Sequence, residues 1–221
     1  MKLRIWTFDL PLKHTFRISR GSVSVQSTLV VELEHQGVCG YGEATTSRYY
    51  QQTIDGMADV IRGSIPKIEA IAPDLSNPEW PAETWAQLDE SLSASRFAQC
   101  AVDEATWDLH GKLLGAPLHQ LWSADLNKAP LSDYTIGLDS IEVMRRKLQE
   151  FSDWPIFKIK LGTENDAEIL RAMRQATPAA LRVDANCGWT SQSARILTPV
   201  CQECGVEFVE QPLPATEVAA M

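Results

Sequence analysis

Four polar side chains at the ends of strand-like segments could together perform proton transfer: Lys158, Lys160, Asp184 and Glu210. Lys158 and Lys160 are two residues apart in a β-rich segment, so their side chains share one face of the strand. Two neighbouring ammonium groups disfavour each other's charge, and burial adds to this, so we expect lowered pKa values for both lysines. A lysine with a lowered pKa is a usable general base.

The two carboxylates end successive segments of the same kind. If these strands are parallel neighbours, their ends lie about 5 Å apart in the backbone. Carboxylates that close repel each other unless a cation or a proton lies between them. Taken singly, Asp184 could cap a turn and Glu210 could precede a proline-stiffened loop, so the interpretation as a Mg²⁺ site depends on the pair. Mg²⁺ beside a lysine base suits removal of a proton α to a carboxylate, with the cation stabilising the enolate.

A regular alternation of strand and helix is expected to position these side chains. Polar residues at strand ends recur every 24 to 26 residues, at Thr135, Lys160, Asp184 and Glu210. Such a repeat is typical of parallel α/β folds, in which ligands bind beyond the carboxyl ends of the strands. The pattern alone leaves open a (β/α) barrel or an open doubly wound sheet. No glycine-rich phosphate motif follows any strand, which disfavours nucleotide-binding versions. We expect strands at 134–137, 156–161, 181–184 and 206–210, and helices at 141–151, 165–176 and 191–203.

The first part of the chain has a different pattern. Alternating runs at 3–10, 28–34 and 38–43 predict a small antiparallel sheet. Gly21 and the serines around it predict a mobile loop before the second strand. Apolar spacing predicts helices at 52–68, 83–91 and 97–114. We therefore predict an α+β capping domain over residues 1–125, followed over residues 126–221 by a partial (β/α) barrel of about four of eight βα units.

Composition and charge exclude several classes of partner. The chain has 221 residues with 20 basic and 29 acidic side chains, a net charge of −9. Without a basic cluster, we expect neither nucleic acid nor an anionic membrane as a partner. No apolar run reaches the roughly 18 residues that a transmembrane helix requires. Five cysteines are an odd, sparse set that favours reduced thiols and a cytoplasmic location.

Three segments in the second half resemble the enolase superfamily: KIK at residues 158–160, VDAN at 183–186 and VEQPLP at 209–214. The sequence is most similar to the muconate-lactonizing branch and, within it, to dipeptide epimerases such as L-Ala-D/L-Glu epimerase. The resemblance extends over essentially the whole chain. The segment FRISRGS at 16–22, and GEA at 42–44 with the tyrosines that follow, look like the two specificity loops of the capping domain.

The resemblance implies a role for each matching residue in the second half. Lys160 would be the acid/base at one face of the substrate α-carbon. Lys158 would lie by the substrate carboxylate and help to lower the pKa of Lys160. Asp184 and Glu210 would bind Mg²⁺ as the cofactor. The same pattern calls for a third metal carboxylate, a second catalytic lysine and an aspartate pair further along the barrel, and none of these precedes Met221.

The resemblance also implies a small-molecule dipeptide substrate. Arg20 would hold the side-chain carboxylate of a glutamate-like residue, although it could also be an ordinary exposed arginine. Thr135 would contact substrate, although β-propensity alone explains a threonine there. A muconate cycloisomerase or o-succinylbenzoate synthase is the alternative within the superfamily. The other alternative is a catalytically inert half-barrel. We expect the missing groups either in a longer protein, of which this sequence is the N-terminal part, or in another chain, through a homo-oligomer or a complementing partner.

Overall fold

The computed structural model describes the backbone of residues 1–220 and the side chains of residues 1–217. The chain divides into two compact units. The first contains Met1–Pro11 and Val25–Ala129, and the second contains Leu12–Ser24 and the chain from Pro130 onward. The tip of the first β-hairpin therefore belongs to the second unit. The domain boundary at residues 125 and 126 stays a prediction.

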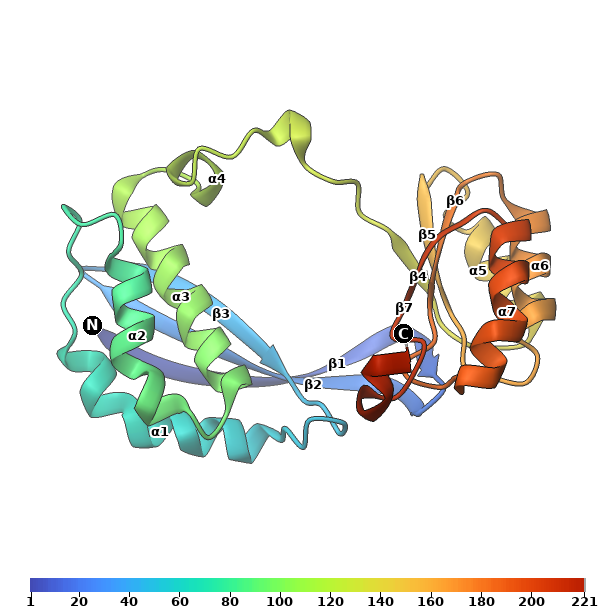
Figure 1. The fold of residues 1–221 in the computed structure, drawn as a ribbon. Helices are drawn as coiled ribbons and strands as arrows, with labels where there is room; N and C mark the ends of the chain where they lie inside the picture. The colour runs from blue at the N-terminus through green and yellow to red at the C-terminus, as the bar shows by residue number, and fades with distance from the viewer. Residues whose placement is uncertain (221) are drawn as a thin grey trace. The chain divides into compact units, whose positions relative to one another are not determined.

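The first unit contains an antiparallel sheet with helices on one face (Figure 1). The strands, in the order β1-β2-β3, are β1 (Lys2–Ile18), β2 (Gly21–His35) and β3 (Val38–Thr45). The helices are α1 (Ile54–Ala70), α2 (Trp80–Leu92), α3 (Arg96–Leu114) and the short α4 (Leu118–Leu121), followed by a 3-10 turn at Leu126–Lys128. Helix α3 lies directly on β3 because Gly42 has no side chain: a Cβ there would be 2.0 Å from the carbonyl oxygen of Ala101.

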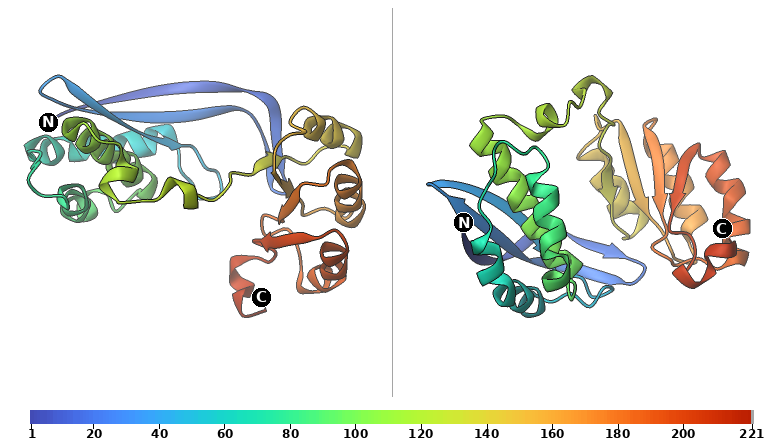
Figure 2. Two further views of the ribbon diagram at one scale, coloured as in Figure 1. Left: turned by 90° about the horizontal axis from the view of Figure 1, so that it is seen from above. Right: turned by 60° about the vertical axis from the view of Figure 1, so that its left-hand side comes forward.

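The second unit is a partial (β/α) barrel, as predicted. Its strands pair in parallel in the order β4 (Tyr134–Ile136), β5 (Ile156–Lys160), β6 (Ala180–Asp184) and β7 (Val206–Glu210). The helices that connect and follow them are α5 (Ile141–Gln149), α6 (Asp166–Ala176), α7 (Ser191–Glu203) and a 3-10 segment at Ala215–Ala220. Helices α5, α6 and α7 lie on one side of the strands (Figures 1 and 2).

Strand alternation separates the core of the second unit from its chemistry. Phe157 and Ile159 on β5 are fully buried in the cluster that the strands form with the helices. Because side chains alternate along a strand, Lys158 and Lys160 point to the opposite face. That face is the concave side of the partial barrel, where residues of a closed barrel would meet.

The β1–β2 hairpin differs from the sequence prediction. Strand β1 continues through Pro11 to Ile18, and β2 begins at Gly21, so a two-residue turn replaces the expected mobile loop. Pro11 is tolerated because β1 is an edge strand of its sheet. The tip also gains a backbone partner, since the N–H of Leu138 donates to the carbonyl oxygen of Arg17 at 2.8 Å.

Helix α2 begins at Trp80, before the predicted start, because Pro81 occupies the first turn, where its missing N–H costs nothing.

None of the helices in the described part of the chain is both long and apolar enough to span a membrane.

Candidate functional site

Register brings the predicted residues together at the carboxyl ends of three strands. Lys160 on β5 pairs with Asp184 on β6, and Asp184 pairs with Glu210 on β7. Thr135 on β4 pairs with Lys158 and is half-buried. The parallel alignment places all five side chains on one face because each occupies an equivalent alternating position.

Ion pairs link the four charged groups in an alternating chain. Lys160 Nζ donates to Asp184 Oδ2 at 2.6 Å, and Lys158 Nζ lies 3.4 Å from the same oxygen. Lys158 Nζ also donates to Glu210 Oε2 at 2.6 Å. The side chain of Asp184 is 1% exposed and that of Lys160 is 10% exposed. Each buried charge therefore has an opposite charge within contact distance, as burial requires.

These contacts shift the acidities of Asp184 and Lys158. Burial alone would raise the pKa of Asp184, but hydrogen bonds from Lys160 and from the backbone of Asn186, with the charges of both lysines, lower it below its usual value. Burial alone would lower the pKa of Lys158, but its hydrogen bond to Glu210 and the charges of both carboxylates raise it. The expectation of a lowered pKa for Lys158 is therefore wrong in this structure, because its carboxylate contacts outweigh the effect of burial.

The donor atoms suit a hard divalent cation in type. Asp184 and Glu210 supply carboxylate oxygens at adjacent strand ends, the ligands that Mg²⁺ prefers. Asn186 Oδ1 is a buried oxygen with no hydrogen-bond partner among the described residues. No group of three or more His, Cys, Asp or Glu side chains within the described residues is arranged to hold a metal. The observed set therefore fits part of a magnesium site.

The hairpin tip lies over this group of charges within the second unit. The ring centroid of Phe16 is 5.7 Å from Lys160 Nζ, within the range of a cation–π contact. Ser19 Oγ donates to the carbonyl oxygen of Ala185, one residue after Asp184, at 3.4 Å. Arg20 is the next residue of the turn and is exposed. The tip thus contributes an aromatic cover to the candidate base.

Sequence reasoning missed a buried carboxylate that organises the loops around the site. Asp166, which is 1% exposed, accepts from the N–H groups of Gly162 and Thr163, each at 2.8 Å. It also accepts from the indole N–H of Trp189 at 2.6 Å. Asp166 therefore ties the loop after β5 to the loop after β6. The Thr163-x-x-Asp166 spacing, a helix-start pattern, was the available signal.

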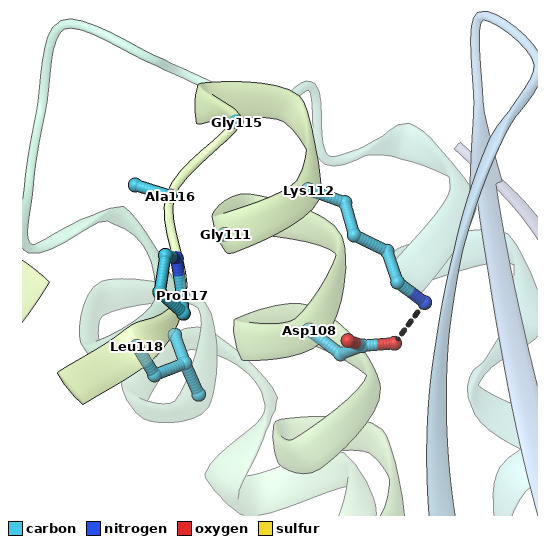
Figure 3. Close-up of a pocket in the computed structure, with 7 residues that line it drawn as sticks. All are labelled: Asp108, Gly111, Lys112, Gly115, Ala116, Pro117 and Leu118. Carbon is cyan, nitrogen blue, oxygen red and sulfur yellow. Dashed lines mark hydrogen bonds and ion pairs between the residues drawn. The ribbon is translucent and has the colours of Figure 1, made fainter. Parts of the chain in front are cut away.

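A hollow of about 320 Å³ in the first unit contains none of the predicted site residues. Figure 3 shows it at the end of α3, where Lys112 and Asp108 form a 2.6 Å ion pair. Its lining residues are Asp108, Gly111, Lys112, Gly115, Ala116, Pro117 and Leu118. The predicted site residues therefore lie at the strand ends of the second unit and not in this hollow.

The fold and the strand-end charges are those of an enolase-type protein, and sequence profiles agree. The mandelate racemase / muconate lactonizing enzyme N-terminal domain matches residues 2–122, and the enolase C-terminal domain-like profile matches residues 142–221. The chain therefore belongs to the mandelate racemase / muconate lactonizing enzyme family of the enolase superfamily. The resemblance inferred from the sequence motifs is confirmed.

Individual relatives include several epimerases. The L-Ala-D/L-amino acid epimerase of Maribacter sp. is 42% identical over 221 residues, covering 100% of this chain and 64% of that protein. The L-Ala-D/L-Glu epimerase of Bacteroides thetaiotaomicron is 32% identical over 220 residues, covering 99% of this chain and 56% of that protein. The structure of a dipeptide epimerase from Enterococcus faecalis V583, complexed with Mg and L-Leu-L-Tyr, matches with a TM-score of 0.88 at 29% identity, covering 99% of this chain and 62% of its own. This chain thus spans less than two thirds of the length of each.

Proposed function

We propose that this chain supplies one proton-transferring lysine and two Mg²⁺-binding carboxylates for the epimerization of a dipeptide. The observation that carries the proposal is the strand-end register of Lys160, Asp184 and Glu210, with the Lys160 ammonium 2.6 Å from Asp184. The names of the relatives support epimerization, and the Enterococcus structure supports Mg²⁺. Two-base epimerization needs a second base on the opposite face of the substrate, so we propose only one half-reaction for these residues.

The two lysines and the two carboxylates at the strand ends have separate tasks in this proposal. Lys160, in its neutral amine form, would take the α-proton at Nζ; its side chain is held at the strand ends by Asp184 and covered by Phe16. Lys158, which bridges Asp184 and Glu210, stabilises negative charge on the substrate carboxylate. A Mg²⁺ ion held by Asp184 and Glu210 would supply Lewis-acid stabilisation of that carboxylate.

We propose an Ala-Glu-like dipeptide as the substrate. Arg20, at the turn of the hairpin whose tip covers Lys160, would pair with the glutamate side chain. Thr135, in register with Lys158, would contact the substrate from β4. The Ala-Glu specificity named for the Bacteroides relative supports this substrate class. A cytoplasmic location is also proposed, and the five unpaired cysteines are compatible with it.

Hydrogen exchange at the substrate α-carbon tests the half-reaction directly. The chain is incubated with Mg²⁺ and L-Ala-L-Glu in D₂O, and the α-proton of the second residue is followed by NMR. We expect loss of that signal for the wild-type chain and no loss for Lys160→Met. Deuterium incorporation without inversion of configuration is expected where only one base acts. Absence of exchange in the wild-type chain would refute the proposal for these 221 residues and support the inert half-barrel.

Substrate choice has its own test. Replacing Arg20 with methionine should reduce exchange far more for Ala-Glu than for Ala-Ala, because only the first has a carboxylate for Arg20 to pair with. Equal losses with the two dipeptides would remove Arg20 from substrate recognition. A matched assay with muconate would detect the cycloisomerase alternative, and turnover there in place of exchange would favour that reaction.

A further inference from the structure

We propose that the three glycines Gly137, Gly162 and Gly188 form a seat that fixes the hairpin tip and so sets where Arg20 meets the substrate. These are positioning residues for specificity, and this role rests on the proposed function. We use "seat" for these three glycines and "tip" for Leu12–Ser24, the hairpin segment within the second unit.

The tip is attached to the first βα unit by polar contacts along its length. The N–H of Leu138, directly after Gly137, donates to the carbonyl oxygen of Arg17 at 2.8 Å. Lys13 and His14 each place a nitrogen 3.0 Å from Glu150 Oε2, near the end of α5. The first strand of the tip is therefore part of the packing of the second unit.

The closest contacts occur where three successive βα loops have no side chain. A Cβ added to Gly162 would lie 2.7 Å from Ser19 Cβ, and a Cβ added to Gly188 would lie 3.2 Å from the same atom. A Cβ added to Gly137 would lie 3.2 Å from both the nitrogen and the oxygen of Arg17. Carbon atoms pack at about 3.5–4.0 Å, so an added methyl group would displace the tip.

The loops beneath Ser19 are braced and cannot simply retreat. Asp166 accepts hydrogen bonds from the N–H of Gly162 at 2.8 Å and from the indole of Trp189, next to Gly188, at 2.6 Å. Asp166 is 1% exposed, so loss of either hydrogen bond would leave a buried polar group unsatisfied. At Gly162 and Gly188, displacement would therefore fall on the tip and not on the braced loops. At Gly137, all three nearest atoms belong to the tip, so a Cβ there presses on the tip alone.

Displacing the tip would move the residues that face the substrate. Phe16 contacts Lys160 from one side of Ser19, and Arg20 follows Ser19 directly. Recognition by a paired charge depends steeply on geometry, and a misplacement of about 1 Å can reduce an enzymatic rate by roughly 100-fold. The shift of a few tenths of an ångström that an alanine at Gly137 requires should therefore reduce selectivity for a glutamate side chain by about tenfold.

Gly137→Ala is the most selective perturbation. All three of its nearest atoms belong to the tip, namely the nitrogen and oxygen of Arg17 and Cδ2 of Phe16, whereas an alanine at Gly188 would also contact Gly162 and Ala185. Gly137→Val extends the perturbation with a larger side chain. Gly63→Ala is the matched control, because a Cβ there has no heavy atom within 4 Å.

Trypsin digestion tests whether the seat holds the tip and does not depend on catalytic activity of the chain, since the tip contains the cleavage sites Arg17 and Arg20. We expect cleavage after these arginines to be several-fold faster in Gly137→Ala than in the wild-type chain and faster again in Gly137→Val, with Gly63→Ala unchanged. Circular dichroism of each variant confirms that the chain is folded before digestion. Equal cleavage rates in Gly137→Ala and the wild-type chain would overturn the seat.

Dipeptide binding tests whether displacement of the tip changes substrate specificity. The ratio of the dissociation constants for Ala-Ala and Ala-Glu, measured by titration calorimetry with Mg²⁺ present, should fall about tenfold in Gly137→Ala and stay at the wild-type value in Gly63→Ala. Faster trypsin cleavage with an unchanged ratio would overturn the specificity role. If the wild-type chain binds neither dipeptide, both the specificity role and the proposed function fail, whereas the trypsin rates still show whether the glycines hold the tip.

Discussion

Replacing Asp184 with asparagine should strongly destabilise the second unit, because its buried carboxylate is the ion-pair partner of Lys160 and also lies near Lys158. The Asp184 carboxylate, 1% exposed, lies 2.6 Å from Lys160 Nζ and 3.4 Å from Lys158 Nζ. Removing one partner from a buried ion pair costs about 3–5 kcal/mol, chiefly because the remaining charge stays buried without compensation. Lys158 keeps Glu210 at 2.6 Å, so Lys160 bears most of this cost. We expect Asp184→Asn to lower the free energy of unfolding by about 4 kcal/mol.

The same geometry predicts a smaller decrease in the free energy of unfolding for Lys160→Met. Asp184 would keep Lys158 and the backbone N–H of Asn186, which donates to it at 2.8 Å. The expected loss is about 2 kcal/mol, the range of one hydrogen bond to a charged group. In Asp184→Asn combined with Lys160→Met, the buried ammonium is removed together with its partner. The double variant should therefore be less destabilised than the sum of the single variants by about 2 kcal/mol.

Urea unfolding in a buffer containing a metal chelator measures these three free energies of unfolding. Hydrogen exchange of peptides from β5 and β6 assigns the loss to the second unit, since protection there reports local opening. Losses that add to within about 0.5 kcal/mol would show that the two side chains do not act as a pair, and would refute the reasoning from their contact.

Three further outcomes follow from the structure. Gly42→Ala should destabilise the first unit by about 3 kcal/mol in urea unfolding, because its Cβ would lie 2.0 Å from the oxygen of Ala101, whereas Gly63→Ala should not. Burial lowers the pKa of His110 from 6.5, so the folded protein favours the neutral ring. The melting temperature should therefore stay constant above pH 6.5 and decrease as the pH falls below it. His110→Gln should remove this dependence. Saturating Mg²⁺ at about 100 times its dissociation constant should add about 2.7 kcal/mol to the unfolding free energy, and Glu210→Gln should lose most of this gain; an equal gain in both proteins would exclude Glu210 as a ligand.

The clustering of the candidate residues at the strand ends was predictable from sequence because two simple rules determine it. The two-residue alternation of a strand assigns Phe157 and Ile159 to the core and both lysines to the other face. The repeat of strand and helix then aligns Lys160, Asp184 and Glu210 in register. Neither rule requires knowledge of contacts between distant residues.

The hairpin tip and the pKa of Lys158 were not predictable, because each depends on residues far away in the sequence. Leu138, which pairs with the tip, is more than a hundred residues from Arg17. Polar residues and Pro11 interrupt the alternation of β1, so its pattern ends before the strand does. The pKa of Lys158 depends on a 2.6 Å contact with Glu210, and the strand-end pattern places the two residues near each other without showing that their side chains pair.

The division of strand β1 between the two compact units limits how this protein can be recombined. Residues 2–11 of the strand belong to one unit and residues 12–18 to the other. A chimera that exchanges the first 125 residues with those of a relative would also replace Leu12–Ser24, a piece of the recipient's second unit. The hairpin tip of the relative would have to fit against Gly137, Gly162 and Gly188 of the chain that receives it. The packing of an exchanged hairpin tip is therefore constrained by three positions that lie outside the exchanged segment.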